Sequence, residues 1–143
     1  MKTARIPYRK YNNILFIKKI DYDIRRKYKK VTYLYETYIN NEQVKETLHN
    51  KNYPSVIEYY NNKICKIEYW VHGKLHRDYG PSIIHLDKKH NITNEEWYKN
   101  GIKLDKNEID SIKKIIDRKL KMIKIILKMK SNVKSSPTNY PNP

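Results

Sequence analysis

Histidine and cysteine are the residue types of this chain whose side chains are best suited to bind a metal or to transfer protons. The 143 residues include five histidines, and two pairs of them are closely spaced, His72 with His76 in HGKLH and His85 with His90 in HLDKKH. Histidines four positions apart share a face on a helix, but this rule does not hold across a hairpin turn. Because HGKLH spans a predicted hairpin turn, we expect no metal site from this pair.

A nuclease site would need His85, Asp87, His90 and Asn91 to assemble around a metal ion, and no motif supports that arrangement. Cys65 lies in a predicted strand without a catalytic signature, where a lone cysteine is usually a small buried apolar residue. A single cysteine also excludes an intramolecular disulfide framework and is compatible with a reducing compartment. We therefore expect a protein that is not an enzyme and that holds no metal and no cofactor.

Basic residues alternate with tyrosines near the N-terminus, in RIPYRKY and RRKYKK. Lysine and arginine contact phosphates, and aromatic rings stack on single-stranded bases for about 1–3 kcal/mol each. A predicted C-terminal helix adds a stripe of lysines, for which a solvated surface is the alternative interpretation. No groove-reading motif is present, so we expect binding that is largely independent of sequence. The candidate nucleic-acid-binding residues are Arg5, Arg9, Lys10, Arg25, Arg26, Lys27, Tyr28, Lys29, Lys30, Lys113, Lys121, Lys124 and Lys128.

The formal net charge of +16 and the sequence pI near 9.8 favour a polyanionic partner. Lysine, asparagine, isoleucine and tyrosine are abundant, and all four have AT-rich codons, so the total charge also fits codon bias. The distribution of charge is more informative, because basic residues concentrate in residues 1–30 and 105–143 and residues 31–104 are nearly neutral. Blocks of one sign at chain ends are typical of interaction arms, and solubility is the alternative explanation.

Residues 31–104 alternate runs rich in tyrosine, isoleucine, valine and threonine with pairs of turn residues. Asparagine and glycine tolerate the positive φ that tight hairpin turns need, and β-branched and aromatic residues suit strands. The predicted turns are Asn40-Asn41, Asn61-Asn62, His72-Gly73 and Asn100-Gly101. The predicted strands span residues 13–20, 31–39, 43–48, 55–60, 64–71, 82–87, 92–98 and 102–104.

The residues after the last predicted strand have a helical pattern. Asp105 and Glu108 resemble a capping box, and no glycine or proline follows from Lys106 to Lys130. One narrow apolar stripe is expected to contact the sheet; its members are Ile109, Ile112, Ile116, Leu120, Ile123 and Leu127. Further apolar residues lie outside this stripe and make the apolar surface of the helix wider than one sheet contact needs. We expect a partner helix of a homodimer to cover it; the alternatives are, in order, burial of the helix within the monomer and contact with an anionic membrane surface. Residues 131–143 contain three prolines, and we expect them to be disordered.

A pattern of 27 residues recurs between TLHNKNYPSVI and KLHRDYGPSII, in which Leu-His, Pro-Ser and the closing isoleucine repeat. Trp70 and Trp97 have the same separation. Repeated units that cannot bury a face alone stack on their neighbours, so we expect the Leu-His pair to end one strand and the proline to open the next. The repeated histidines are interpreted as structural residues that bond backbone groups between hairpins, and the tryptophans as core residues. The residues assigned to the repeat structure are Leu48, His49, Pro54, Trp70, Gly73, Leu75, His76, Pro81, Trp97 and Gly101.

The stretches EYWVHGKLHRDYGPSII and EEWYKNGIKL resemble MORN-like repeats, in particular the variant W-x-x-N-G-K-L-H-R-x-x-G-P-A found in uncharacterised proteins of large DNA viruses and some bacteria. The resemblance covers roughly half the chain. The matching residues of the second unit are Trp70, Gly73, Lys74, Leu75, His76, Arg77, Asp78, Gly80 and Pro81. The resemblance implies a meandering ribbon of β-hairpins that serves as a scaffold or interaction surface, without catalytic residues.

The sequence thus predicts a mainly β fold with one helix. A basic N-terminal arm with one strand spans residues 1–30, antiparallel MORN-like hairpin repeats span 31–104, a long basic amphipathic helix spans 105–130 and a disordered tail follows. The predicted function is non-enzymatic binding of DNA or RNA through the basic ends; the alternative is a structural or adaptor protein of a large DNA virus. We also expect a protein partner or homodimer through the helix, no secretion signal or membrane span, and an intracellular location in the cytoplasm, a viral factory or a virion.

Overall fold

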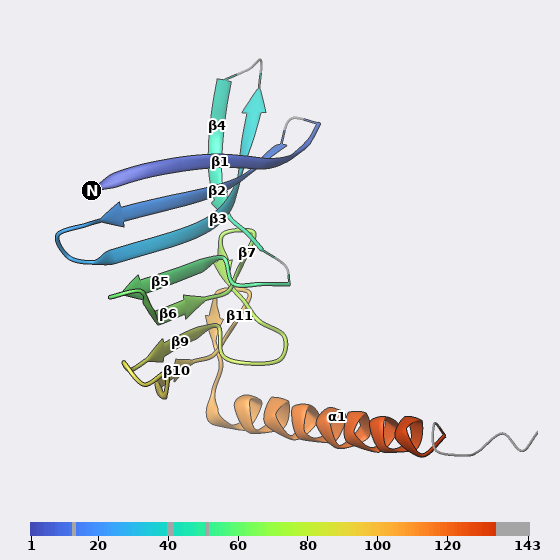
Figure 1. Ribbon diagram of the computed structural model, residues 1–143. Coiled ribbons are helices and arrows are strands. Elements are labelled where there is room, and N and C mark those ends of the chain that lie inside the picture. The colour runs from blue at the N-terminus through green and yellow to red at the C-terminus, as the bar shows by residue number, and fades with distance from the viewer. Residues whose placement is uncertain (13, 40–41, 51, 134–143) are drawn as a thin grey trace, which may run out of the picture. The chain divides into compact units, whose positions relative to one another are not determined.

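The computed structural model describes residues 1–12, 14–39, 42–50 and 52–133. The chain forms two compact units, Met1–Asp105 and Lys106–Pro143. The first unit is built of antiparallel strands and the second contains one helix, α1 (Lys106–Val133), so the protein is mainly β, with meandering hairpins before a C-terminal helix, as predicted (Figure 1). None of the described residues forms a helix that is long and apolar enough to cross a membrane.

The first unit contains one main sheet of eight strands. Their order is β1-β2-β3-β5-β6-β9-β10, with β4 paired to β3, and all neighbours are antiparallel (Figure 1). The bounds are β1 (Lys2–Tyr11), β2 (Ile14–Asp23), β3 (Tyr28–Ile39), β4 (Glu42–Leu48), β5 (Val56–Tyr60), β6 (Lys63–Glu68), β9 (Ile83–Leu86) and β10 (Ile92–Glu96). The order along the sheet follows the order along the chain, except that β4 is off this path and pairs with β3 alone.

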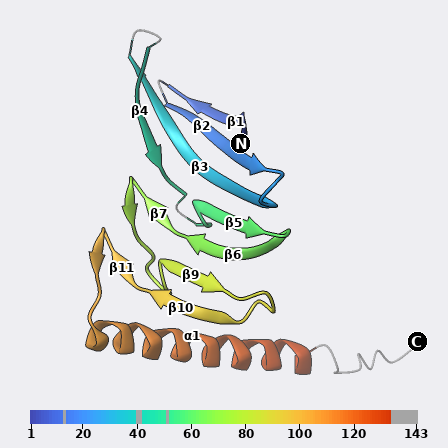
Figure 2. The same cartoon turned by 90° about the vertical axis from the view of Figure 1, so that its left-hand side faces the viewer.

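A row of hairpins accompanies the main sheet. The first half of β3 pairs with β5, whereas its second half, from Leu34, pairs with β4. Two short hairpins follow, β7 (Trp70–Val71) with β8 (Lys74–Leu75) and β11 (Tyr98–Lys99) with β12 (Ile102–Lys103). Figure 2 shows β4, β7 and β11 one after another along one side of the sheet. The predicted turns of the short hairpins are confirmed by positive φ angles at His72, Gly73, Asn100 and Gly101.

Backbone hydrogen bonds link each hairpin to the next in the same way. The N–H of Gly73 donates to the carbonyl of Leu48 at 2.9 Å, and the N–H of Gly101 donates to the carbonyl of Leu75 at 2.8 Å. Leu48 ends β4 and Leu75 ends β8, as the repeat predicts. Both glycines have positive φ, which lets the turn present its N–H to the preceding hairpin.

The repeated histidines add a second link at the same joint. Nδ1 of His49 accepts a hydrogen bond from the N–H of His72 at 3.2 Å, and Nδ1 of His76 accepts one from the N–H of Asn100 at 3.1 Å. These bonds join a side chain to the backbone of the next hairpin. They are the structural role that the repeated Leu-His position suggested.

The repeated serines connect the sheet to the hairpins. Oγ of Ser55 donates to the carbonyl of Trp70 at 2.9 Å and accepts the N–H of Trp70 at 3.2 Å. Oγ of Ser82 makes the same two bonds with Tyr98, at 2.8 Å and 3.2 Å. Both serines are fully buried. Trp70 therefore corresponds structurally to Tyr98.

The expectation that Trp70 and Trp97 share one repeat position is wrong. Trp97 corresponds to Tyr69 instead, because the carbonyl of Trp97 accepts from Leu104 at 2.9 Å just as that of Tyr69 accepts from His76 at 3.0 Å. The loop between β9 and β10 is longer than the Asn61-Asn62 turn between β5 and β6, and it shifts the register by one residue. Trp97 is buried, as expected of a core residue, whereas Trp70 is only partly buried.

Tyr69 and Trp97 each interrupt a strand that the sequence predicted as continuous. The strand predicted over 64–71 is broken after Glu68, and the strand predicted over 92–98 is broken after Glu96. Tyr69 and Trp97 each lie between a main-sheet strand and a hairpin strand. The chain changes partners at these residues, which a continuous run of β-forming side chains does not reveal.

The N-terminal region is not an arm with one strand. Residues 2–11 form the edge strand β1, β2 extends to Asp23, and β3 begins at Tyr28. Strand β1 was not predicted because its sequence contains Pro7 and several basic residues, which are unusual in a central strand. An edge strand leaves one side unpaired, so it tolerates proline, charge and the register shift between Pro7 and Arg9.

Helix α1 begins directly after Asp105, as the predicted cap requires, and it continues three residues past the predicted end, to Val133. Residues 131–133 are therefore helical and do not belong to a disordered tail. The rest of that predicted tail, residues 134–143, lies outside the described residues. The expected contact between the apolar stripe of α1 and the sheet stays a prediction, since each unit is described by itself.

Candidate nucleic-acid interface

The main sheet separates its charged residues between its two faces. Residues directly opposite each other in an antiparallel pair project from the same face. By this register every carboxylate of β1–β3, β5 and β6 falls on one face, here named the ion-pair face: Asp21, Asp23, Glu36, Glu58 and Glu68. The opposite face of these five strands, here named the aromatic face, carries Tyr8, Arg9, Phe16, Lys18, Lys29, Tyr33, Tyr35 and Tyr59.

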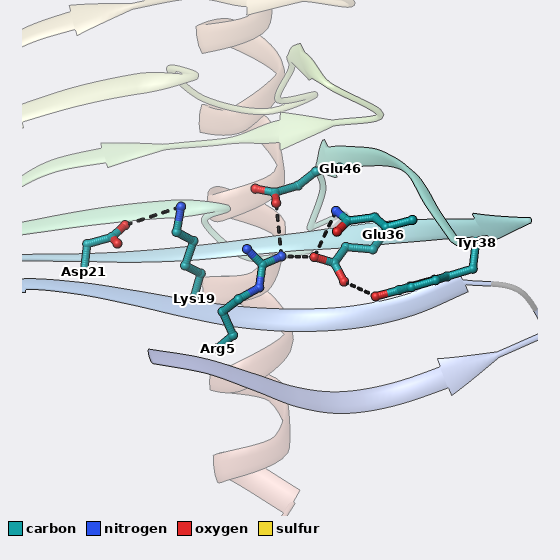
Figure 3. Close-up of polar contacts among 7 residues, drawn as sticks. Arg5, Lys19, Asp21, Glu36, Tyr38 and Glu46 are labelled. Carbon is teal, nitrogen blue, oxygen red and sulfur yellow. Dashed lines mark hydrogen bonds and ion pairs between the residues drawn. The ribbon is translucent and has the colours of Figure 1, made fainter. Parts of the chain in front are cut away.

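Arg5 belongs to a dense network on the ion-pair face (Figure 3). Its Nη2 forms ion pairs with Oε1 of Glu36 and, at 3.1 Å, with Oε2 of Glu46. The Tyr38 hydroxyl and the Gln43 amide also donate to Glu36, at 2.6 Å and 3.2 Å. Glu36 is only 2% exposed, and a buried carboxylate is destabilising by several kcal/mol unless it is paired and hydrogen-bonded. Arg5 therefore compensates a buried charge within the sheet.

Other ion pairs neutralise the same face. The nitrogen-to-oxygen distances are 3.9 Å for Lys19 with Asp21, which Figure 3 also shows, 3.5 Å for Lys30 with Glu58 and 2.6 Å for Lys66 with Glu68. Nε1 of Trp70 donates to Glu68 at 2.8 Å. Each carboxylate of these three pairs thus lies beside a lysine of the same sheet.

The ionisation of these groups reflects their pairing. Burial opposes the ionisation of Glu68, but hydrogen bonds from Lys66 and Trp70 outweigh it and hold the pKa of Glu68 below its ordinary value. The same bond to Glu68 raises the pKa of Lys66. Burial, together with the charge and hydrogen bonding of Glu58, raises the pKa of Tyr28 to about 12. Tyr28 thus interacts with Glu58 on the ion-pair face.

The N-terminal candidates for phosphate contact are not brought together on one surface. Arg5, Lys10 and Lys30 lie on the ion-pair face, whereas Arg9 and Lys29 lie on the aromatic face. The exposed segment Arg25–Lys27 forms the turn between β2 and β3, where the Arg26 side chain lies 3.9 Å from a carboxylate oxygen. The candidate lysines of α1 belong to the other unit. Convergence of the two sets of basic residues stays a prediction.

A chain of ring contacts runs across the aromatic face. The ring centroids are 6.2 Å apart for Tyr8 and Phe16, 6.3 Å for Tyr8 and Tyr33, and 6.2 Å for Phe16 and Tyr35. From Tyr35 the contacts continue to His49 at 5.6 Å. Tyr8 is 53% exposed and the other rings of the row are partly exposed. The row therefore offers ring surface to a ligand while its neighbours hold each ring in place.

Three cations lie over rings of this face. The distances from charged group to ring centroid are 5.9 Å for Arg9 over Phe16, 5.9 Å for Lys18 over Tyr33 and 4.0 Å for Lys29 over Tyr59. Among the described residues, no carboxylate forms an ion pair with any of the three. The aromatic face thus combines rings with positive charge that no carboxylate of the described ranges neutralises by an ion pair.

Most residues of the aromatic face were missed by sequence reasoning. Phe16, Lys18, Tyr33, Tyr35 and Tyr59 were not candidates, because they come from three strands whose pairing register is needed to bring them together. A usable signal was present in the centre of β3, where alternation places Tyr33 and Tyr35 on one face and Thr32 and Glu36 on the other.

Asp87, Asn91 and Cys65, which were considered for metal or thiol chemistry, have structural partners. The Asp87 carboxylate accepts the N–H groups of Lys89 and Asn91, at 2.7 Å and 2.9 Å, and the Asn91 side-chain amide at 3.0 Å, which closes the loop between β9 and β10. Sγ of Cys65 contacts the carbonyl of Glu58 at 3.4 Å, and burial, with the nearby Glu58 charge, raises the pKa of the thiol. Within the described ranges, no group of three or more histidine, cysteine or acidic side chains is placed to hold a metal.

Comparison of the chain with protein-family models, with curated proteins and with solved structures finds no match. The resemblance to MORN-like repeats stays a prediction based on the residues of the second repeat unit. The aromatic face is accordingly defined by its geometry and its charge.

Proposed function

We propose that this protein is a binding protein, without catalytic activity, that holds single-stranded nucleic acid on the aromatic face, largely without sequence specificity. The observation that supports the proposal is the row of contacting rings beside three cations that form no ion pair with a carboxylate of the described residues. Every base has a π-face, so stacking on such rings tolerates any sequence. Lysine and arginine beside the rings supply contacts to phosphates.

The aromatic face favours single strands over duplexes. Bases within a duplex are stacked on one another, and rings attached to a sheet reach only bases that are unstacked and splayed out. The ion-pair face offers no comparable surface, because four of its cations are paired with buried or partly buried carboxylates: Arg5, Lys19, Lys30 and Lys66. The net positive charge of the chain adds long-range attraction to any polyanion.

Binding to labelled oligothymidylate, oligouridylate and a duplex of equal length tests the proposal. We expect tighter binding to the single strands, and a loss of at least about thirtyfold in affinity for Tyr8→Ala combined with Tyr59→Ala, from about 1–3 kcal/mol for each of the two stacked bases. Lys18→Gln and Lys29→Gln should each lower the slope of log affinity against log salt by about 0.7.

Matched controls come from the opposite face. Tyr60 is 49% exposed and lies on the ion-pair face, so Tyr60→Ala should leave affinity unchanged. Lys30→Gln removes the same charge as Lys29→Gln from the adjacent residue and should leave the salt slope unchanged. Equal losses in the controls, or no binding at physiological salt, would contradict the proposal and would favour the adaptor role, in which the repeat surface binds another protein.

A further inference from the structure

Helix α1 exposes an unusual amount of apolar surface. Large apolar side chains along its second half are between 46% and 64% exposed. They are Leu120, Met122, Ile123, Ile125, Ile126, Leu127 and Met129. At about 100° per residue, the apolar residues of the helix cover an arc of roughly 220°. A helix that contacts one sheet needs a stripe only somewhat wider than about 100°, so this arc exceeds what one such contact would cover.

The charged residues in the second half of the helix are all basic. Residues 118–130 contain six basic residues and no acidic one: Arg118, Lys119, Lys121, Lys124, Lys128 and Lys130. Lys121, Lys124 and Lys128 fall within the polar arc, and the other three are placed on or beside the apolar arc. Long basic side chains bury their methylene stems along apolar surface while the charged ends reach water or phosphate. The segment is therefore complementary to a surface that is apolar and negatively charged.

A second copy of the helix fits this charge pattern poorly. In a parallel pair formed along Leu120, Ile123 and Leu127, Lys119 of one helix would lie beside Lys124 of the other. Such flanking positions normally carry opposite charges, and like charges there oppose association. An earlier lysine, Lys113, would also lie in the seam between the two helices. In a parallel pair, the flanking positions of the second half of the helix thus lack complementary charges.

We propose that α1 docks on a lipid membrane that contains anionic headgroups, with its axis in the plane of the interface. A wide apolar arc with lysines on the polar face is typical of helices that lie in this interface. The anionic surface attracts each lysine, and the acyl boundary receives the isoleucine, leucine and methionine side chains. The helix is not long and apolar enough to span the membrane, which agrees with docking on its surface.

Flotation of the full chain with vesicles tests the proposal. We expect the protein to float with vesicles of phosphatidylcholine and phosphatidylserine and to remain behind with phosphatidylcholine alone. Ile123→Gln combined with Leu127→Gln should weaken the partitioning at least about a hundredfold, because two large apolar side chains no longer enter the acyl boundary. Lys121→Gln and Lys124→Gln should each weaken it about fivefold, corresponding to about 1 kcal/mol per lysine.

A matched control substitutes isoleucines of the other unit. Ile39 and Ile102 are 57% and 72% exposed, and Ile39→Gln with Ile102→Gln should leave flotation unchanged. Oligonucleotide binding by the helix variants should equal that of the natural sequence, which shows that the aromatic face is intact and separates this proposal from the proposed function. Absence of flotation, or a dimer in sedimentation equilibrium that the Ile123 and Leu127 substitutions dissociate, would overturn docking on lipid in favour of a protein partner.

Discussion

Adjacent lysines of β3 have opposite roles. Lys29 lies over the ring of Tyr59, whereas Lys30 pairs with Glu58 on the other face. In the sequence both belong to one basic segment, which suggested a single interaction arm. Side chains alternate between the faces of a strand, so the sheet divides such a segment into two groups with different neighbours. Composition predicted that this region is basic, but only the pairing of strands shows which charges are neutralised.

Arg5 stabilises the fold by pairing with the buried Glu36 carboxylate, and Arg5→Gln tests this role. We expect the free energy of unfolding to fall by about 1–3 kcal/mol, because the buried Glu36 carboxylate loses its ion-pair partner. Urea denaturation measures the change. Arg9→Gln removes the same charge from the same strand and should change stability by less than about 0.5 kcal/mol.

A double substitution distinguishes lost pairing from lost packing. Combining Arg5→Gln with Glu36→Gln removes the buried charge, so stability should recover part of the loss caused by Arg5→Gln alone. If the two substitutions instead add without interaction, the network of Figure 3 does not stabilise the sheet as described.

The hairpins were predictable from the sequence because their signals are local. Pairs such as Asn61-Asn62 and Asn100-Gly101 adopt the positive φ that tight turns require. Strand β1 was not predictable in the same way, since an edge position tolerates a composition that resembles a flexible arm. The one-residue shift between Trp70 and Trp97 was missed because it depends on the length of a loop, and an unbroken 27-residue spacing concealed it.

The buried serines Ser55 and Ser82 connect the main sheet to the short hairpins by side-chain hydrogen bonds. Ser82→Ala removes a donor to the Tyr98 carbonyl and an acceptor for its N–H, so we expect a loss of about 1–3 kcal/mol in stability. Ser55→Ala should have a similar effect through Trp70. Hydrogen exchange of the Tyr98 and Trp70 amides should accelerate at the joint that is altered. Ser111→Ala, on the exposed surface of α1, serves as the control and should be neutral; an equal loss there would contradict the special role of the joints.

At the scale of the whole molecule, the two units divide two kinds of surface between them. The sheet unit carries rings with cations beside them, and the helix unit carries apolar side chains with lysines. The sequence predicted both basic ends, and it also predicted the helix from its cap and uninterrupted pattern. It did not show that the tyrosines of the nearly neutral centre join the N-terminal strands in one face, because that arrangement depends on strands that are distant in the chain.

Removal of residues 106–143 tests this division. The sheet unit contains its own hydrogen-bond ladder and the buried apolar residues Ile17, Val31, Leu34, Val56, Ile83 and Trp97, so the shortened chain should unfold cooperatively in urea. It should retain single-strand affinity within a few-fold, since the aromatic face is complete and the charge that is lost belongs to the other unit, whereas flotation with anionic vesicles should disappear. Loss of cooperative unfolding would instead mean that α1 covers apolar surface of the sheet, and the stripe from Ile109 to Leu127 would then be part of the core rather than a docking surface.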